Sequence, residues 1–243
     1  MGLRAVLVIV VAALAASGQA ELSAVQASPQ RASPSLWGDL RPGPHSVGHR
    51  VTRVFDPTRT FGARVGATGT SDVRLVTVHV WYPASTSSAG SMVLQDYLAL
   101  NETDGPITPA VRQRRELDLD GLWSDLCICR APRTGADARL TTPPGTPVAA
   151  VGSATPAEGR HPVVVYSLGD DMHSLENVVL WEYLASHGYM VAVTPSMGHK
   201  EVPMEPIGLT AVEIRARDME FALGWLRDVP FADMDRWPPL ASA

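Results

Sequence analysis

Short, continuous apolar runs mark the second half of the chain. Residues 163–166 and 189–193 are rich in β-branched side chains and show no polar alternation. Such runs are typical of strands buried on both faces of a parallel sheet. The stretch between them has helical spacing, and a strand, a helix and a second strand predict a crossover between parallel strands. The fold class expected from this pattern is α/β, with a mostly parallel sheet and crossover helices.

The helix between these two runs is predicted from its ends and its apolar spacing. Ser174 is expected to be its N-cap, and Gly188 its left-handed C-terminal residue. Its core-facing side chains are expected to be Val179, Leu180, Tyr183 and Leu184.

A second helix is predicted after residue 210. Residues 210–213 have the pattern of a capping box, and Pro230 stops the helix. Its expected core-facing side chains are Val212, Ala216, Met219, Leu223 and Leu226. Pro238 and Pro239 then exclude a further central strand in the remaining residues.

The middle of the chain is less regular. Two early strands are predicted at residues 51–55 and 73–81, where β-branched residues partly alternate. Residues 84–160 form an irregular insertion with two candidate helices, near 92–100 and 109–126. An insertion of this length is more than a turn, and it either covers a pocket or is a surface excursion.

The N-terminus has the order of a secretory signal peptide. Arg4 precedes the apolar residues 5–16, which are too short for a stable membrane span, and cleavage is expected after Ala20. Residues 21–45 read as a flexible leader. The expected location is secreted or periplasmic.

Charge and cysteine content exclude several function classes. Removal of residues 1–20 changes the formal charge from −5 to about −6, which gives no electrostatic case for nucleic acid. The arginines at 112–115 are followed by acidic residues and read as a solvated, charge-balanced helix face. Cys127 and Cys129 lie two positions apart, where their side chains diverge, so they are interpreted as incidental thiols.

Residues 162–169, followed by 182–189, resemble the third strand and first helix of α/β-hydrolases. The match is best with the dienelactone-hydrolase and platelet-activating-factor-acetylhydrolase-like group. Residues 80–83, 218–226 and 235–236 fit the same pattern in the same order. The resemblance implies a partial α/β-hydrolase domain over residues 46–236, with a tail at 237–243.

This resemblance implies roles for two residues. The loop after the third strand supplies a backbone N–H to the oxyanion hole in this family. Gly169 would be the turn glycine and the N–H of Asp170 the donor. Asp170 and Asp171 depart from the family, since each carboxylate at about 4 Å would oppose an oxyanion by around 4 kcal/mol. Alternatively, they simply begin a helix.

A nucleophile elbow is not found. No Gly-x-Ser-x-Gly occurs, and the sequence stops a few residues after Asp235 and Arg236, before the elbow would follow. The expected fold is therefore an incomplete α/β-hydrolase. The function expected is that of an ancestral serine carboxylic ester hydrolase for small esters, without a cofactor and inactive as this chain because the triad is missing.

The incomplete sheet suggests a second function. Without the next strand, residues 163–166 would form an apolar edge that invites self-association or a partner strand. The alternative is therefore a non-catalytic secreted binding module that uses the insertion or this edge.

Other residues offer weaker chemistry. Ser196 follows the strand at 189–193, and His199 and His187 are its nearest candidate bases. The alternative is an ordinary loop serine, because elbow glycines are absent. A divalent metal near the strand ends would have four candidate ligands, Asp170, Asp171, His173 and His199. Such clusters of loop carboxylates and histidines are common by chance, and no helix-spaced ligand pair supports a site, so no metal is expected.

Overall fold

The computed structural model describes residues 35–60, 73–85, 91–125, 145–168, 174–195 and 208–235. All of them belong to the second of two units, Ser33–Ala243. The predicted signal peptide (residues 1–20), residues 21–34, both cysteines and the predicted tail at 237–243 lie outside the described residues. Among the described helices, none is both long and apolar enough to cross a membrane.

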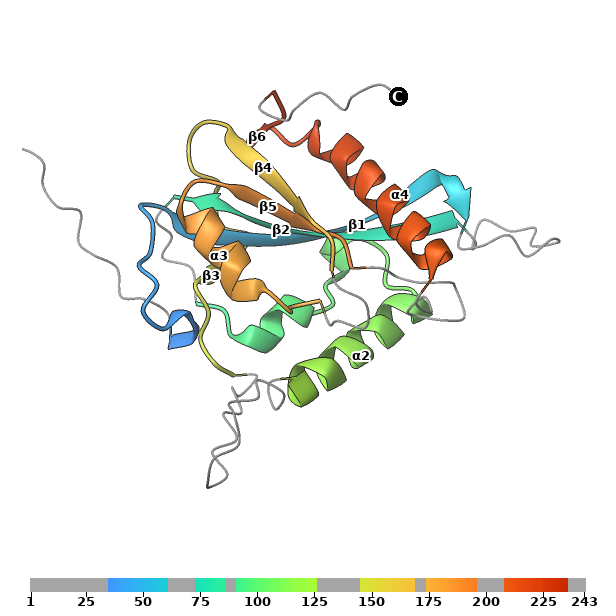
Figure 1. Ribbon diagram of the computed structural model, residues 1–243, viewed down its shortest axis with the longest axis horizontal. Helices are drawn as coiled ribbons and strands as arrows, with labels where there is room; N and C mark the ends of the chain where they lie inside the picture. The colour runs from blue at the N-terminus through green and yellow to red at the C-terminus, as the bar shows by residue number, and fades with distance from the viewer. Residues whose placement is uncertain are drawn as a thin grey trace, which may run out of the picture. The chain divides into compact units, whose positions relative to one another are not determined.

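Six described strands form one mixed, mostly parallel sheet in the order β3-β1-β2-β5-β4-β6 (Figure 1). The strands are β1 (Ser46–Thr60), β2 (Val73–Ala84), β3 (Ala150–Gly152), β4 (His161–Tyr166), β5 (Met190–Val193) and β6 (Ala232–Asp233). β1 pairs antiparallel with β2, and β2 antiparallel with β5. The pairs β1–β3, β4–β5 and β4–β6 are parallel. The predicted α/β fold class is confirmed.

The described helical segments lie between and beside these strands. They are η1 (Ser35–Trp37), η3 (Leu94–Leu98), η4 (Glu102–Asp104), α2 (Pro109–Asp125), α3 (Val178–Ser186) and α4 (Leu209–Leu226). Both helical segments predicted in the insertion are present, as η3 and α2. The short strand β3, which comes from the same insertion, was not predicted.

Two core clusters cover opposite faces of the sheet. Val191 and Val193 of β5 pack with α3 and η3, whereas Met190 and Ala192 pack with α4. This alternation follows from the two-residue period of a strand. Figure 1 shows α3 and α4 on opposite sides of the sheet. The described helical segments of the insertion, η3 and α2, therefore pack on the same face as α3 and are not a surface excursion.

The two crossover helices are present, but the predicted faces were partly wrong. In α3 the buried apolar residues are Val178, Trp181 and Ala185. The predicted Val179 and Leu184 pack against the same core, while Leu180 is 44% exposed. Gly188 has a φ of +98°, as a left-handed C-terminal residue should. Leucine and valine at helical spacing do not reveal which face is covered when both faces carry apolar residues.

In α4 the predicted face and cap were also partly wrong. Ala211, Ala222 and Leu226 are buried, whereas Val212 is 58% exposed. The N-cap is Gly208, and no side-chain hydrogen bond caps the helix. Leu226 is the predicted core residue that is fully buried.

Residues 35–45 contact α3, which corrects the prediction of a flexible leader that extends to residue 45. Trp37 is buried and packs edge-on against Tyr183 of α3. The backbone N–H of Gly43 donates to Ser186 Oγ, and that of His45 donates to the Ser186 carbonyl. An indole at the end of a polar, proline-rich segment is sufficient to fix this segment on α3.

Glu182 of α3 joins three separate parts of the chain. Its fully buried carboxylate accepts hydrogen bonds from Trp37 Nε1 at 2.8 Å, from the Tyr97 hydroxyl, and from the backbone of Ala149 at 2.9 Å and Ala150 at 3.2 Å. Burial raises the pKa of Glu182, while these donors act against that rise. A buried carboxylate without partners is strongly destabilising, so this residue orders η1, η3 and β3 around α3.

The strand β6 follows α4 as a two-residue strand at the edge of the described sheet, in agreement with the expectation that no central strand forms there. It pairs with β4 only at His161 and Pro162. Within the described residues, Val163 to Tyr166 pair with β5 on one side and with no strand on the other. The predicted edge at 163–166 is therefore present in the part of the sheet that the structure describes.

The Glu182 network predicts a specific loss of stability. In Glu182→Gln, an amide N–H₂ group replaces a carboxylate oxygen that accepts a hydrogen bond, so two donors face each other. The free energy of unfolding, measured by urea titration, is therefore expected to fall by about 1–3 kcal/mol. Glu213→Gln is the control, because the Glu213 side chain is 61% exposed and pairs only with Arg217 on α4. A change within about 0.5 kcal/mol is expected there. Equal losses in both variants would contradict the assigned role of Glu182.

Candidate functional site

The carboxyl ends of β4 and β5 meet at one edge of the sheet. The paired residues Tyr166 and Val193 end these two parallel strands. Ligands of α/β proteins bind beyond this edge. Gly169, Asp170, Ser196 and His199 follow these strand ends in the sequence, but all four lie outside the described residues. The structure instead describes their neighbours, from which we build the site.

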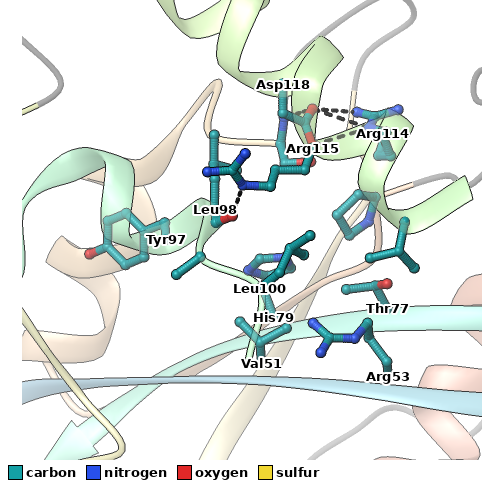
Figure 2. Close-up of a pocket in the computed structure, with 14 residues that line it drawn as sticks. Val51, Arg53, Thr77, His79, Tyr97, Leu98, Leu100, Arg114, Arg115 and Asp118 are labelled. Carbon is teal, nitrogen blue, oxygen red and sulfur yellow. Dashed lines mark hydrogen bonds and ion pairs between the residues drawn. The ribbon is translucent and has the colours of Figure 1, made fainter. Parts of the chain in front are cut away.

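A small cavity of about 40 Å³ lies at this edge, between the sheet and the insertion (Figure 2). Ser174 precedes α3 and Pro195 follows β5, and both line it. The remaining wall comes from β1, β2, η3 and its following residues, and α2: Val51, Arg53, Thr77, His79, Tyr97, Leu98, Ala99, Leu100, Val111, Arg114, Arg115 and Asp118. The insertion therefore supplies much of the lining of this cavity.

Asp118 is the carboxylate of the cavity wall, and it is buried. Arg114, four residues earlier on α2, donates from Nε at 3.1 Å and from Nη2 at 3.0 Å. Ser174 donates from its backbone N–H at 2.9 Å and from its hydroxyl at 2.6 Å. Figure 2 shows the carboxylate of Asp118 turned toward Arg114. This geometry corrects two predictions: Arg114 and Asp118 are not on a solvated helix face, and Ser174 is not the N-cap, which is Asn177.

Two arginines of the wall bind backbone carbonyls. Arg53 donates to the carbonyls of Asn101, Gly105 and Pro106, and so fixes the segment around η4. Burial lowers the pKa of Arg53, and the nearby charge of Asp104 acts against this. Arg115 donates to the carbonyl of Leu98 at 3.0 Å. Arg53 thus connects β1 to the insertion, and Arg115 connects α2 to η3 within the insertion.

A buried histidine pair lies beneath the insertion. His49 Nε2 and His79 Nδ1 are 3.3 Å apart, and the His49 ring packs against Trp81 and Tyr97. Burial lowers the pKa of His79 to about 4, while the charge of Asp118 acts against this decrease. Burial and the charge of His79 hold the pKa of His49 well below its usual value. Both imidazoles are therefore neutral at pH 7.

The described groups of the cavity are not arranged as a nucleophilic triad. In a triad, the imidazole lies between the hydroxyl and the carboxylate. Here the Ser174 hydroxyl donates directly to Asp118, and His79 is paired with His49. A serine hydroxyl that donates directly to a carboxylate, with no imidazole between them, is not arranged for activation as a nucleophile. Ser174 is therefore a structural residue, although it lies at the functional edge.

His187, one predicted base for Ser196, is the C-cap of α3 and precedes β5. Ser196 follows that strand in the sequence and lies outside the described residues, so this pairing stays a prediction. The metal alternative remains a hypothesis, because its four residues lie outside the described residues. Among the described residues, no group of three His, Cys, Asp or Glu side chains is placed to hold a metal ion.

Comparison with known proteins gives a structural likeness. No family model and no curated protein matches the chain. Among solved structures it is similar to a ferulic acid esterase from Streptomyces cinnamoneus, with a TM-score of 0.50 and 20% identity. The fold is shared with an esterase. The likeness covers 83% of this chain and 51% of the esterase, so the chain spans about half of the length of that enzyme.

The histidine pair predicts an acid-sensitive fold. His79 titrates at about 4 in the folded state and near 6.5 when unfolded, so the unfolded chain binds more protons between these values. The free energy of unfolding should therefore fall as the pH decreases from about 6.5 to about 4, by up to about 1.4 kcal/mol per pH unit for each histidine.

Urea titrations across this pH range test the expectation. His79→Gln should reduce the pH slope, because a neutral side chain takes the place of one imidazole. The matched control is His187→Gln, at an exposed position. An unchanged slope in His79→Gln would show that the pair does not cause the acid sensitivity.

Proposed function

We propose that this chain provides the scaffold and the oxyanion loop of an α/β-hydrolase-type ester hydrolase, of the dienelactone-hydrolase and platelet-activating-factor-acetylhydrolase-like group. One observation carries the proposal: a cavity lined by both polar and apolar side chains lies at the carboxyl edge of a mostly parallel sheet whose fold is shared with an esterase. In this proposal the chain is exported, loses residues 1–20, and binds small esters without a cofactor.

The position of the loop after β4 supports this role. Residues 167 and 168 leave the edge directly after Tyr166, and Ser174 returns to it beside Asp118. Gly169 and the N–H of Asp170 lie between them in the sequence and are the proposed oxyanion donors. Donors at such a position act on the negative charge that develops on an ester carbonyl.

We further propose that the chain does not hydrolyse esters by itself. The sequence contains no Gly-x-Ser-x-Gly. Ser174 and His79, a serine hydroxyl and an imidazole that line the cavity, are bound to partners that leave neither free for a relay. Oxyanion donors without an activated nucleophile bind a substrate carbonyl but do not open an acyl-transfer path.

An esterase assay tests this proposal. The purified full chain is incubated with 4-nitrophenyl acetate and butyrate, before and after a serine-directed fluorophosphonate, with an active ferulic acid esterase as reference. The expected result is hydrolysis no faster than the buffer blank, and no fluorophosphonate adduct in the mass spectrum. Inhibitable turnover that disappears in Ser196→Ala would overturn the proposed inactivity and make Ser196 the nucleophile.

The edge of β4 favours a second candidate function. In the described sheet, β6 covers only His161 and Pro162, so four further residues of β4 offer backbone groups to an added strand. A module that binds a partner strand, or a second copy of itself, would use this edge. Such binding requires no catalytic residue.

Self-association provides the test of this edge. Sedimentation velocity at increasing concentration is expected to show association of the full chain. Val165→Lys should reduce it, because a charge on an edge strand blocks strand addition. Val212→Lys is the control, since Val212 is an exposed apolar residue of α4. A monomer at all concentrations, or equal effects of both variants, would exclude self-association through this edge.

A further inference from the structure

We propose that Asp118 is a positioning residue for the carboxyl edge of the sheet. Through Ser174, the helix α2 of the insertion would fix the segment that leads into α3. This inference rests on the proposed function only for the chemistry of the edge, and its test measures local structure instead of ester turnover.

Both polar donors of Ser174 are bound by the same carboxylate. Ser174 is 1% exposed, and its N–H and hydroxyl reach the two oxygens of Asp118 at 2.9 and 2.6 Å. The two residues are 56 positions apart in the sequence. A carboxylate that accepts two hydrogen bonds from one residue restricts both its position and its orientation.

The pairing with Arg114 points to positioning as the purpose of Asp118. Arg114 and Asp118 are both buried, and their ion pair lies within one helix. Buried ion pairs contribute little net stability compared with apolar residues of the same size, but they specify geometry in several proteins. Arg114 compensates the charge of Asp118, and the remaining acceptor capacity goes to Ser174.

A second contact fixes the same segment from the sheet. Asn177 Nδ2 donates to the Tyr166 hydroxyl at 2.7 Å, and that hydroxyl donates to Glu176 at 3.0 Å. Asn177 is the N-cap of α3, yet its side chain makes no cap hydrogen bond. Residues 174–177 are thus held by α2 at one end and by the last residue of β4 at the other. The start of α3 is set by these two anchors.

Amide hydrogen exchange of the full chain by NMR tests the role of Asp118. The Ser174 amide reports the local contact, and the amide of fully buried Val191 in β5 reports the core. In Asp118→Ala, the ratio of the Ser174 exchange rate to the Val191 exchange rate is expected to rise at least about tenfold. Asp118→Asn keeps one acceptor oxygen and should give an intermediate increase.

A matched control separates positioning from general destabilisation. Asp218 is another buried aspartate, paired with Arg74 on the other face of the sheet. Asp218→Ala should accelerate Ser174 and Val191 by similar factors. The inference is overturned if the ratio of the Ser174 rate to the Val191 rate changes no more in Asp118→Ala than in Asp218→Ala. If Asp118→Ala does not fold, the same comparison is made with Asp118→Asn and with Ser174→Ala, which removes only the hydroxyl.

Discussion

The burial of β2 on both faces is the constraint on which the rest of the structure depends. Apart from its first residue, every side chain of this strand is buried, and β1 and β5 pair with it on either side. A strand of this kind needs apolar cover above and below the sheet. α4 supplies that cover on one face, and α3 with the insertion supplies it on the other. Thr77 and His79 of β2 lie on the face that the insertion covers, and they line the cavity at this edge.

Buried carboxylates connect the layers around this strand. Glu182 connects α3 with η1, η3 and β3, Asp118 connects α2 with the start of α3, and Asp218 connects α4 with Arg74 of β2. An unpaired buried carboxylate is disfavoured by several kcal/mol, so the elements that donate to it are held in one arrangement. The insertion is thereby an integral part of the fold, and its helix α2 contributes to the shape of the functional edge.

The shared fold and the chemistry of the edge are separate questions. The fold is shared with an esterase, but a reaction depends on particular side chains. The described hydroxyl, imidazole and carboxylate at the cavity are bound in an order that holds the structure together. For this reason the proposed function assigns the described residues to the scaffold and to positioning, and assigns substrate contact to the loop after β4.

The sequence by itself determined the α/β class, the runs that became β4 and β5, the helices α3 and α4, and the left-handed Gly188. These features depend on local periodicity and on the conformational freedom of glycine, which are readable over a few residues. The edge of β4 was implied by the resemblance to α/β-hydrolases, and it is present in the part of the sheet that the structure describes.

Only the tertiary structure decided that Trp37 docks on α3, that β3 joins the sheet, and that Arg114, Asp118 and Ser174 form a buried contact. Charged residues at helical spacing have the same pattern on a solvated face as in a buried pair, because the pattern does not record what covers them. Their burial depends on residues that are distant in the sequence, and these meet only when the insertion packs on the sheet.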